Sequence, residues 1–346
     1  MQRLSIAMAV AGMTVGLSVL SAPAGAAGGG VADVAVPKIA RPASLKAPAT
    51  VIGNGTPKSC TSAKVVKAVR KGGVVTFDCG PQPVVIKMAA TAKVVNTRKK
   101  VVIDGGGKVT LDGRGKRRIL YMHTCDKRQT WATSHCQLQS FPVLAVQNIT
   151  LQNGYAPGAS ANDGGGAILA RGGRFKAVNV TFKNNRCSTV GPDVGGAALR
   201  ISSGVPSRPS YVVNSTFTGG RCSNGGGISL WNASLSVYNS RFVNNHATGQ
   251  GLNPARKGTP GGGSGGAIYT DVNTQHLRVA GTLMRNNRGR ASSGAVFFVS
   301  NNRKGRLTIR SSTMTDNPDP AHSRGLPGIF HLGRPAGPTI VSSVID

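Results

Sequence analysis

The acidic residues of this chain are few and of one kind, which limits the catalytic chemistry that the sequence supports. All 11 acidic residues are Asp, and no Glu occurs among the 346 residues. Hydrolysis of a glycosidic bond uses a pair of carboxylates, and Ca²⁺ is held by several oxygen ligands at once. Because the aspartates are scattered along the sequence, we predict no metal site from them.

Basic residues dominate the charge. Lys and Arg together number 42, and the formal net charge is +31. A field of this size favours anionic partners such as an acidic polysaccharide or a cell-wall polymer. The alternative is a solvated basic surface with no specific ligand. Aromatic residues make up only 5% of the chain, too few for base-stacking platforms, so nucleic acid is not expected as a partner.

A sequence repeat determines where these side chains lie. Residues 164–185, GGGAILARGGRFKAVNVTFKNN, contain a Gly-rich step, two short apolar runs and a β-type run that closes on Phe182 and a polar pair. No segment within the repeat has the length and periodicity of an amphipathic helix. This pattern predicts a solenoid of β-strands, a parallel β-helix of about eight or nine coils. The closing residue recurs as Leu151, Phe182, Phe217, Phe242, Met284, Met314 and Val344.

Individual positions of the repeat predict individual structural roles. We expect strands at 167–171, 174–178 and 180–184, and loops of variable length before each Gly-rich step, such as 246–264. The Gly-rich steps fit tight bends, where a Cβ would clash or φ must be positive. Asparagine stands three residues before the first four closing residues, and we expect these amides to form a buried ladder: Asn148, Asn179, Asn214 and Asn239.

The pairing of GGAI steps with FxxN steps resembles the repeats of polymorphic membrane proteins. It occurs at residues 165–168 with 182–185, and again at 265–268 with 242–245. The resemblance covers residue 75 onward and places the chain near the pectin-lyase-like superfamily, which implies an all-β, right-handed parallel β-helix. It does not define an activity, because that superfamily includes polysaccharide lyases, glycosidases and non-catalytic adhesins.

The N-terminal region precedes the repeats and differs from them in composition. Residues 1–26 combine an early Arg, an apolar run and the small-residue end Ala24-Gly25-Ala26, which predicts a secretory signal peptide. Residues 27–57 are rich in Pro, Ala and Gly and are expected to be a flexible lead-in. The β-helix domain, 58–346, should begin with a short helix after Thr61 that ends at Gly72 and covers the first coil.

Six cysteines in an exported chain predict disulfides. We pair Cys60 with Cys79 and Cys125 with Cys136, and we pair Cys187 with Cys222 because they occupy the same position in adjacent coils. The alternative for the second pair is a zinc site with His123 and His135, although the spacing of its cysteines matches no common zinc motif.

The family resemblance also implies a location for a site. In β-helix lyases, substrate lies in a groove along the outer face of the first strand of each coil. A metal-free lyase would use Arg200 to neutralise the substrate and Tyr269 or His331 as the base. Ca²⁺ is expected only under the lyase alternative, in the calcium-dependent form that the family pattern implies. The aligned first strands of this chain contribute Arg171, Arg200, Trp231, Asn232, Tyr269, Asp271 and His331.

There are two further interpretations of these positions. The sequence disfavours a glycosidase, which would need a second carboxylate beside Asp271 that only the loop residues Asp163 and Asp193 could supply. Without turnover, the same face would bind a ligand through Arg171, Trp231, Asn232 and Asp271.

We therefore expect a secreted, extracellular, monomeric β-helix protein that binds an anionic polysaccharide or cell-surface polymer without turnover and without a cofactor. A pectate-lyase-like polysaccharide lyase is the first alternative. The second is an adhesin-like protein that binds a protein partner through the long loops at 155–163 and 247–264.

Overall fold

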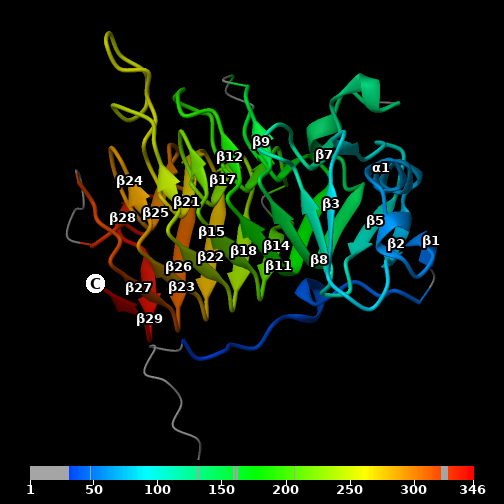
Figure 1. Cartoon of the computed structure of the whole chain (residues 1–346). Coiled ribbons are helices and arrows are strands. Elements are labelled where there is room, and N and C mark those ends of the chain that lie inside the picture. The colour runs from blue at the N-terminus through cyan, green and yellow to red at the C-terminus, as the bar shows by residue number, and fades with distance from the viewer. Residues whose placement is uncertain are drawn as a thin grey trace, which may run out of the picture. The chain divides into compact units, whose positions relative to one another are not determined.

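Strands from successive turns of the chain stack in parallel and form a solenoid. Figure 1 shows the coils following one another from α1 (Ser62–Lys71) to the C-terminal strands. The computed structural model describes residues 31–46, 48–130, 132–158, 160, 163–205, 207–320 and 326–346, which belong to one compact unit. The predicted signal peptide, residues 1–26, lies outside the described residues.

Three parallel sheets form the coils, and four 3₁₀ turns accompany them. Sheet B contains β4 (Ala92–Lys93), β7 (Leu120–His123), β10 (Ile168–Arg171), β13 (Leu199–Ser202), β17 (Ile228–Trp231), β21 (Ile268–Val272), β25 (Val296–Ser300) and β28 (Ile329–Leu332). Sheet C contains β9 (Tyr155–Ala156), β12 (Arg186–Cys187), β16 (Arg221–Cys222), β20 (His246–Ala247) and β24 (Arg288–Gly289). The 3₁₀ turns are η1 (Lys38–Ala40), η2 (Pro57–Ser59), η3 (Lys127–Gln129) and η4 (Cys136–Leu138).

Sheet A is the largest, with 17 strands in two adjoining stacks that β8 and β11 connect. Its strands are β1 (Pro48–Gly53), β2 (Gly73–Asp78), β3 (Val84–Lys87), β5 (Lys100–Asp104), β6 (Val109–Asp112), β8 (Val143–Gln152), β11 (Arg174–Lys183), β14 (Ser210–Val213), β15 (Thr216–Thr218), β18 (Leu235–Tyr238), β19 (Arg241–Val243), β22 (His276–Ala280), β23 (Leu283–Arg285), β26 (Arg306–Arg310), β27 (Thr313–Thr315), β29 (Thr339–Val341) and β30 (Val344–Ile345).

The predicted parallel β-helix is confirmed. β10 is the predicted first strand of its coil, and β11 contains the second and third, which join at Asn179. The backbone of Asn179 has a φ of 54°, the left-handed conformation that Asn adopts more readily than most residues. The chain therefore turns a corner there without interrupting the pairing of β11 with β8.

The closing residues form one buried column, with one correction. Phe182 is the register partner of Leu151 and Phe217, and the column continues through Phe242 and Met284 to Met314. The rings of Phe182 and Phe217 stack with centroids 4.5 Å apart. In the last coil, however, Ile345 opposes Met314, whereas Val344 is 57% exposed. The prediction for Val344 is wrong by one residue, which in a strand reverses the direction of the side chain.

The buried asparagine ladder lies at a different position from the predicted one. Asn179 and Asn214 are exposed, and within the predicted column one amide pair is joined, from Asn179 Nδ2 to Asn148 Oδ1 over 2.9 Å. These four asparagines adopt a positive φ at the corner between strands. Asn occurs at this position because it tolerates the left-handed conformation. The expectation of a buried ladder there is therefore wrong.

The ladder stands three residues after the closing residue. Asn245 Nδ2 donates to Asn287 Oδ1 over 2.9 Å, and Asn287 Nδ2 donates to Asn317 Oδ1 over 3.0 Å. Each amide also donates to a main-chain carbonyl of the preceding coil, as Asn287 does to Phe242 O at 2.9 Å. All three side chains are buried. A buried amide that both donates and accepts in this way links three coils.

The Gly-rich steps make the predicted bends, although a direct alignment of Gly195-Gly196-Ala197 with Gly165-Gly166-Ala167 is wrong by one residue. Gly165 has a φ of 65°, and a Cβ there would collide with the carbonyl of Ile168. Ile168 pairs with Leu199, so that Ala198 rather than Ala197 is the counterpart of Ala167. Gly196 then occupies the position of Gly165, and its φ of 78° is likewise positive.

The predicted helix is α1, which covers the first coil. Thr61 Oγ1 accepts the hydrogen bond of Lys64 N, and Gly72, with a φ of 77°, follows the last helical residue. Val65 and Val69 are buried against the solenoid. Among the helices of the described residues, none is long and apolar enough to cross a membrane.

The lead-in was expected to be flexible, but most of its described part is paired with the solenoid. β1 pairs with β2, and farther upstream Val34 uses its N–H and C=O to bind the side-chain amide of Asn239, each over 2.9 Å. Ala40 is buried among apolar residues of sheet A. The composition of the segment did not predict this pairing, because its apolar residues do not recur at the spacing of a strand or a helix.

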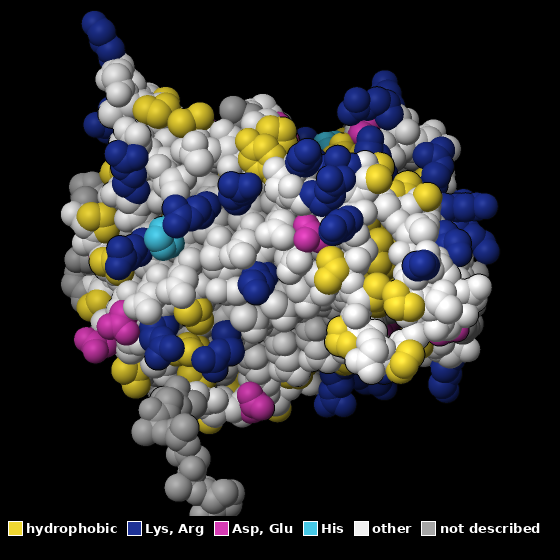
Figure 2. All heavy atoms as spheres, viewed as in Figure 1, with side chains coloured by type: hydrophobic (Ala, Val, Ile, Leu, Met, Phe, Trp, Pro, Cys, Tyr) yellow, Lys and Arg dark blue, Asp and Glu magenta, His cyan; other side chains and the backbone are white. Residues whose placement is uncertain are grey.

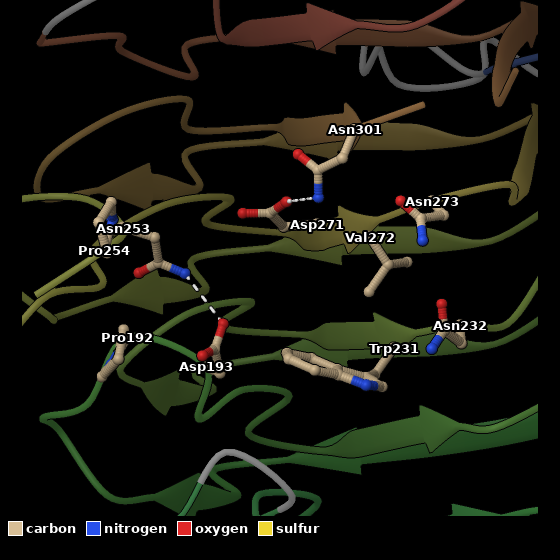
Figure 3. A pocket seen from close by; sticks show the side chains of 10 residues that line it. All are labelled: Pro192, Asp193, Trp231, Asn232, Asn253, Pro254, Asp271, Val272, Asn273 and Asn301. Atoms are coloured by element: carbon tan, nitrogen blue, oxygen red, sulfur yellow. Dashed lines mark hydrogen bonds between the residues drawn. The ribbon is translucent and has the colours of Figure 1, made fainter. Parts of the chain in front are cut away.

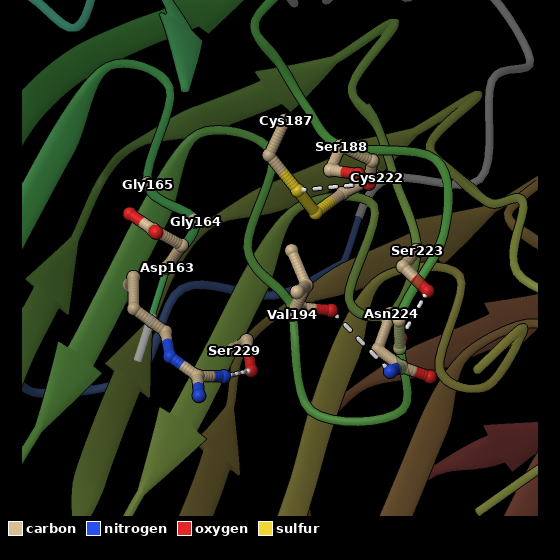
Figure 4. The surroundings of a disulfide bond; sticks show 12 residues. Asp163, Gly164, Gly165, Cys187, Ser188, Val194, Cys222, Ser223, Asn224 and Ser229 are labelled. Atoms are coloured by element: carbon tan, nitrogen blue, oxygen red, sulfur yellow. Dashed lines mark hydrogen bonds between the residues drawn. A yellow bond between two sulfur atoms is a disulfide. The ribbon is translucent and has the colours of Figure 1, made fainter. Parts of the chain in front are cut away.

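All three predicted disulfides are present: Cys60 with Cys79, Cys125 with Cys136, and Cys187 with Cys222. The last pair joins β12 to β16 on adjacent coils, with Cα atoms 4.7 Å apart. Figure 4 shows its surroundings, where Asn224 Nδ2 donates to Val194 O. Because the sulfurs of Cys125 and Cys136 are bonded to each other, they do not serve as zinc ligands.

Phe182→Ala should lower the free energy of unfolding by about 3 to 5 kcal/mol, because a buried, stacked ring is replaced by a cavity. A urea melt measures this change. Lys183→Ala, an exposed neighbour in the same strand, is the control and should change stability by less than about 0.5 kcal/mol. Equal melts for the two variants would contradict the inward direction of Phe182.

Asn287→Ala should cost about 2 to 3 kcal/mol, since it leaves buried groups on two neighbouring coils without a partner. Asn179→Gly removes an exposed amide but keeps the left-handed backbone, and it should stay within about 0.5 kcal/mol of the native chain. If urea melts show the larger loss for Asn179→Gly, the assignment of the ladder is wrong.

Candidate functional site

The outer face of sheet B carries most of the residues that the sequence singled out. Strand alternation places Ile168 and Ala170 inward and Leu169 and Arg171 outward. The register then aligns Arg200 with Ser229 and Ser229 with Tyr269 in one outward row. Trp231 and Asp271 follow Leu230 and Thr270, which are register partners, and so belong to the next outward row.

A cleft of about 520 Å³ opens on this face. Figure 3 shows Trp231, Asp271 and Asn301 on successive coils, with Asp193 and Asn253 contributed by loops at one side. Among the described residues, no Lys or Arg lines the cleft, even though the chain is strongly basic. The lining residues are Pro192, Asp193, Trp231, Asn232, Asn253, Pro254, Asp271, Val272, Asn273 and Asn301.

A hydrogen-bond network connects the two carboxylates of the cleft. Asn253 Nδ2 donates to Asp193 Oδ1 at 3.3 Å and to the Tyr269 hydroxyl at 2.6 Å. The Tyr269 hydroxyl in turn donates to Asp271 Oδ2 at 3.4 Å, and Asn301 Nδ2 donates to Asp271 Oδ1 at 3.3 Å. The loop that contains Asn253 is therefore fixed to the strand that carries Asp271.

Burial shifts the pKa values of the titratable side chains in and beneath the cleft. It raises the pKa of Asp193 and of Asp271, and the charge of Asp193 raises the pKa of Asp271 further. Two carboxyl groups with raised pKa in one polar cleft are the type of arrangement used for proton transfer. Burial also raises the pKa of the Tyr269 phenol well above its ordinary value, so this group stays neutral.

Arg200 supports the cleft from below rather than lining it. Its side chain is fully buried and donates to Ser229 Oγ and, over 2.9 Å, to the main-chain carbonyl of Asp193. The guanidinium lies 5.5 Å from the ring of Trp231. Burial lowers the pKa of Arg200 to about 10, which leaves it charged at neutral pH. Arg200 thus positions the Asp193 loop and the indole.

The structure separates the sequence-predicted site residues into four groups, and Arg171 alone forms the last. Trp231, Asn232 and Asp271 line the cleft, and their role as ligand-binding residues remains a prediction. Arg200 and Tyr269 point outward but are fully buried beneath the loops. His331 points into the core and stacks on Phe298 with ring centroids 5.2 Å apart, so the prediction that it faces the groove is wrong. The alignment of the first strands did not determine which alternate residues point outward, and this caused the error.

A second hollow, of about 390 Å³, lies nearer the N-terminal end of sheet B, and Arg171 contacts His123 in its lining without itself lining the hollow. Arg171 Nη1 lies 3.3 Å from His123 Nε2. Burial, followed by the charge of Arg171, lowers the pKa of His123 to about 4. The Tyr121 hydroxyl donates to Asp126 at 2.9 Å, and Arg118 forms an ion pair with Asp163 at 3.4 Å. Asp163 therefore lies apart from Asp271.

Three polar cleft residues were not identified from the sequence: Asn253, Asn273 and Asn301. Asn273 and Asn301 lie just beyond β21 and β25, where alignment of the coils could have indicated them. Asn253 lies in a long loop with no counterpart in other coils. Among the described residues, no group of three His, Cys, Asp or Glu side chains has the proximity needed to hold a metal ion.

The fold and this outer-face cleft define a β-helix protein with a polar groove. A family model described as a right handed beta helix region matches residues 132–343, more than half of the chain. The chain belongs to this family of right-handed β-helix proteins, as the resemblance to the pectin-lyase-like superfamily implied. No curated protein and no solved structure shows significant similarity to the chain.

Asp271→Asn should raise the free energy of unfolding at pH 7. Burial raises the pKa of Asp271 above its unfolded-state value, so at neutral pH its ionised form destabilises the folded state. This penalty disappears as pH falls below the unfolded-state pKa, and the two chains should have equal stability near pH 3. Urea melts at both pH values test the prediction. A less stable variant at pH 7 would mean that the hydrogen bonds to Asp271 outweigh its burial.

Proposed function

We propose that the protein is an exported β-helix protein that binds a polysaccharide along the outer face of sheet B without turnover. The observation that carries the proposal is the cleft at Trp231, where one indole lies among amide and carboxylate side chains. Sugars present apolar ring faces together with hydroxyl groups that donate and accept, and these groups match such a lining.

The extended shape of the outer face supports a polymer rather than a small sugar. The second hollow lies on the same sheet at β4, β7 and β10, whereas the cleft lies at β17, β21 and β25. Four coil spacings separate β7 from β21, or roughly 19 Å. A chain of several sugar units could contact both hollows. The net charge of +31 supports an acidic polymer, whose anionic groups would lie on basic surface beyond the cleft.

Binding without turnover is favoured over the lyase alternative by the positions of the three catalytic candidates. Arg200 and Tyr269 are buried and engaged with protein groups, and His331 faces the core. None of them is placed to take a proton from a polymer on the outer face. Export is supported by the predicted signal peptide together with the three disulfides.

Glycoside hydrolysis is a second candidate function, and one observation favours it. The loop residue Asp193 and the strand residue Asp271 line the same cleft, and burial raises the pKa of both. One could donate a proton while the other acts as base or nucleophile. Release of reducing ends that is lost in both Asp193→Asn and Asp271→Asn would support this candidate over simple binding.

Trp231→Ala should weaken binding of the preferred polysaccharide about 10-fold, because a stacking surface worth about 1.4 kcal/mol is lost. Affinities should be measured by titration calorimetry over a panel of acidic and neutral polysaccharides, with product assays for unsaturated uronates in parallel. Trp231→Phe keeps an aromatic ring and should retain most of the affinity. Unchanged binding by the Ala variant would exclude the cleft as the sugar site.

A further inference from the structure

A line of cationic side chains lies along the outer side of sheet C. The register pairs Arg186 with Arg221, Arg221 with His246, and His246 with Arg288. These four residues are called the basic row below. Tyr155 is the next position in the same line, and the Arg186 guanidinium lies 5.9 Å from its ring. Figure 2 shows Lys and Arg side chains in a line, with one histidine among them, on this side of the solenoid.

Two buried features fix the spacing of the basic row. Arg186, His246 and Arg288 each follow directly on a buried asparagine: Asn185, Asn245 and Asn287. On the other side, Arg186 and Arg221 are each followed by a cysteine of the disulfide that joins their coils. The backbone of the row is therefore held on both sides. Its side chains repeat at the spacing of the coils, about 4.8 Å.

The positive charges of the row are not neutralised within the described protein. The three arginines are exposed and His246 is partly exposed. Two ion pairs join described side chains, Arg118 with Asp163 and Arg128 with Asp126, and neither involves the row. Like charges on directly opposed strand positions repel each other. An anion lying over the row would relieve this repulsion.

The shape of the row favours a linear polymer with widely spaced charges. Each coil presents one cation, and a sugar unit in an extended glycan advances the polymer by a similar length. Duplex nucleic acid carries a charge every 1.7 Å or so, which is far denser than the row. A membrane offers a broad anionic plane rather than a line. A polysaccharide with one anionic group per sugar unit matches best.

His246 makes the charge of the row depend on pH. Burial lowers the pKa of His246, and the charges of Arg221 on β16 and Arg288 on β24 lower it further. These two arginines are the charged groups that act on His246 from the neighbouring strands. A bound anion opposes their effect, so binding should be coupled to proton uptake. Affinity is then highest below the pKa of His246 and falls as pH rises through it.

We infer that the basic row binds a linear anionic polysaccharide lengthwise, with His246 joining the arginines in acidic solution. The inference rests on the proposed function for the class of ligand only. The surface itself is distinct from the cleft, since the loops that join sheet C to sheet B lie between the two.

The first test uses dextran sulfate of low substitution, with one sulfate per sugar unit on average, whose charge is constant between pH 5 and pH 8. The triple variant Arg186→Gln, Arg221→Gln, Arg288→Gln should lose roughly 100-fold in affinity at low salt and show a shallower salt dependence. A matched control, Arg241→Gln, Arg285→Gln, Arg310→Gln, removes the same charge from exposed positions on sheet A and should lose much less. Thermal melts confirm that both variants fold.

The second test measures the same affinity at pH 5.5 and pH 7.5. The native protein should bind more tightly at pH 5.5, and His246→Gln should remove this difference. His276→Gln is the control, because His276 also has an arginine neighbour, Arg306, but lies on sheet A. A pH dependence that survives in His246→Gln would overturn the role of His246.

The remaining outcomes separate this inference from the proposed function. Trp231→Ala should weaken binding of dextran sulfate by no more than about 10-fold, far less than the triple variant; if only Trp231→Ala loses binding, the cleft is the site and the inference fails. Equal losses in the two triple variants would show that net charge alone attracts the polymer. Anionic vesicles that bind as tightly, with the same dependence on the row, would identify a membrane surface instead and overturn the polysaccharide assignment.

Discussion

The parallel, in-register stacking of coils is the constraint on which the rest of this structure depends. Each strand pairs with the same strand of the coils before and after it, so that a position in one coil touches its equivalents in the next. At inward positions, each added coil places a similar apolar side chain on the one before it, as in the stacked rings of Phe182, Phe217 and Phe242. Outward positions become lines of identical or related side chains with a fixed spacing.

This regularity explains what could be predicted from the sequence. The interval between closing residues identified the solenoid, and the alignment of Asn185-Arg186-Cys187 with Gly220-Arg221-Cys222 identified a disulfide between residues 35 positions apart. The cap was predictable because Thr61, three valines and Gly72 carry the local signals for a helix. Each of these inferences needed only the position of a residue within its repeat.

The site was less predictable from the sequence for two reasons. It depends on which strand side chains point outward, and it depends on loops that differ between coils. A shift of one residue reverses a strand side chain, which is why His331 was assigned to the groove although it stacks on Phe298 in the core. Asp193 and Asn253 come from loops that differ from coil to coil. The burial of Arg200 follows from those same loops, and nothing in the pattern of sheet B indicates how far they fold over it.

The distribution of charge distinguishes the two surfaces more clearly than the net charge does. In a chain of charge +31, the surrounding field should lower the pKa of every carboxyl group. Burial nevertheless raises the pKa of Asp193 and Asp271, so desolvation by the loops outweighs that field in the cleft. On sheet C the arginines are exposed, and the charges of Arg221 and Arg288 add to burial in lowering the pKa of His246. The protein thus has a partly desolvated cleft with no Lys or Arg among its described lining residues and, separately, an exposed cationic line on sheet C. A ligand with both apolar sugar faces and anionic groups would use each surface for a different part of its chemistry.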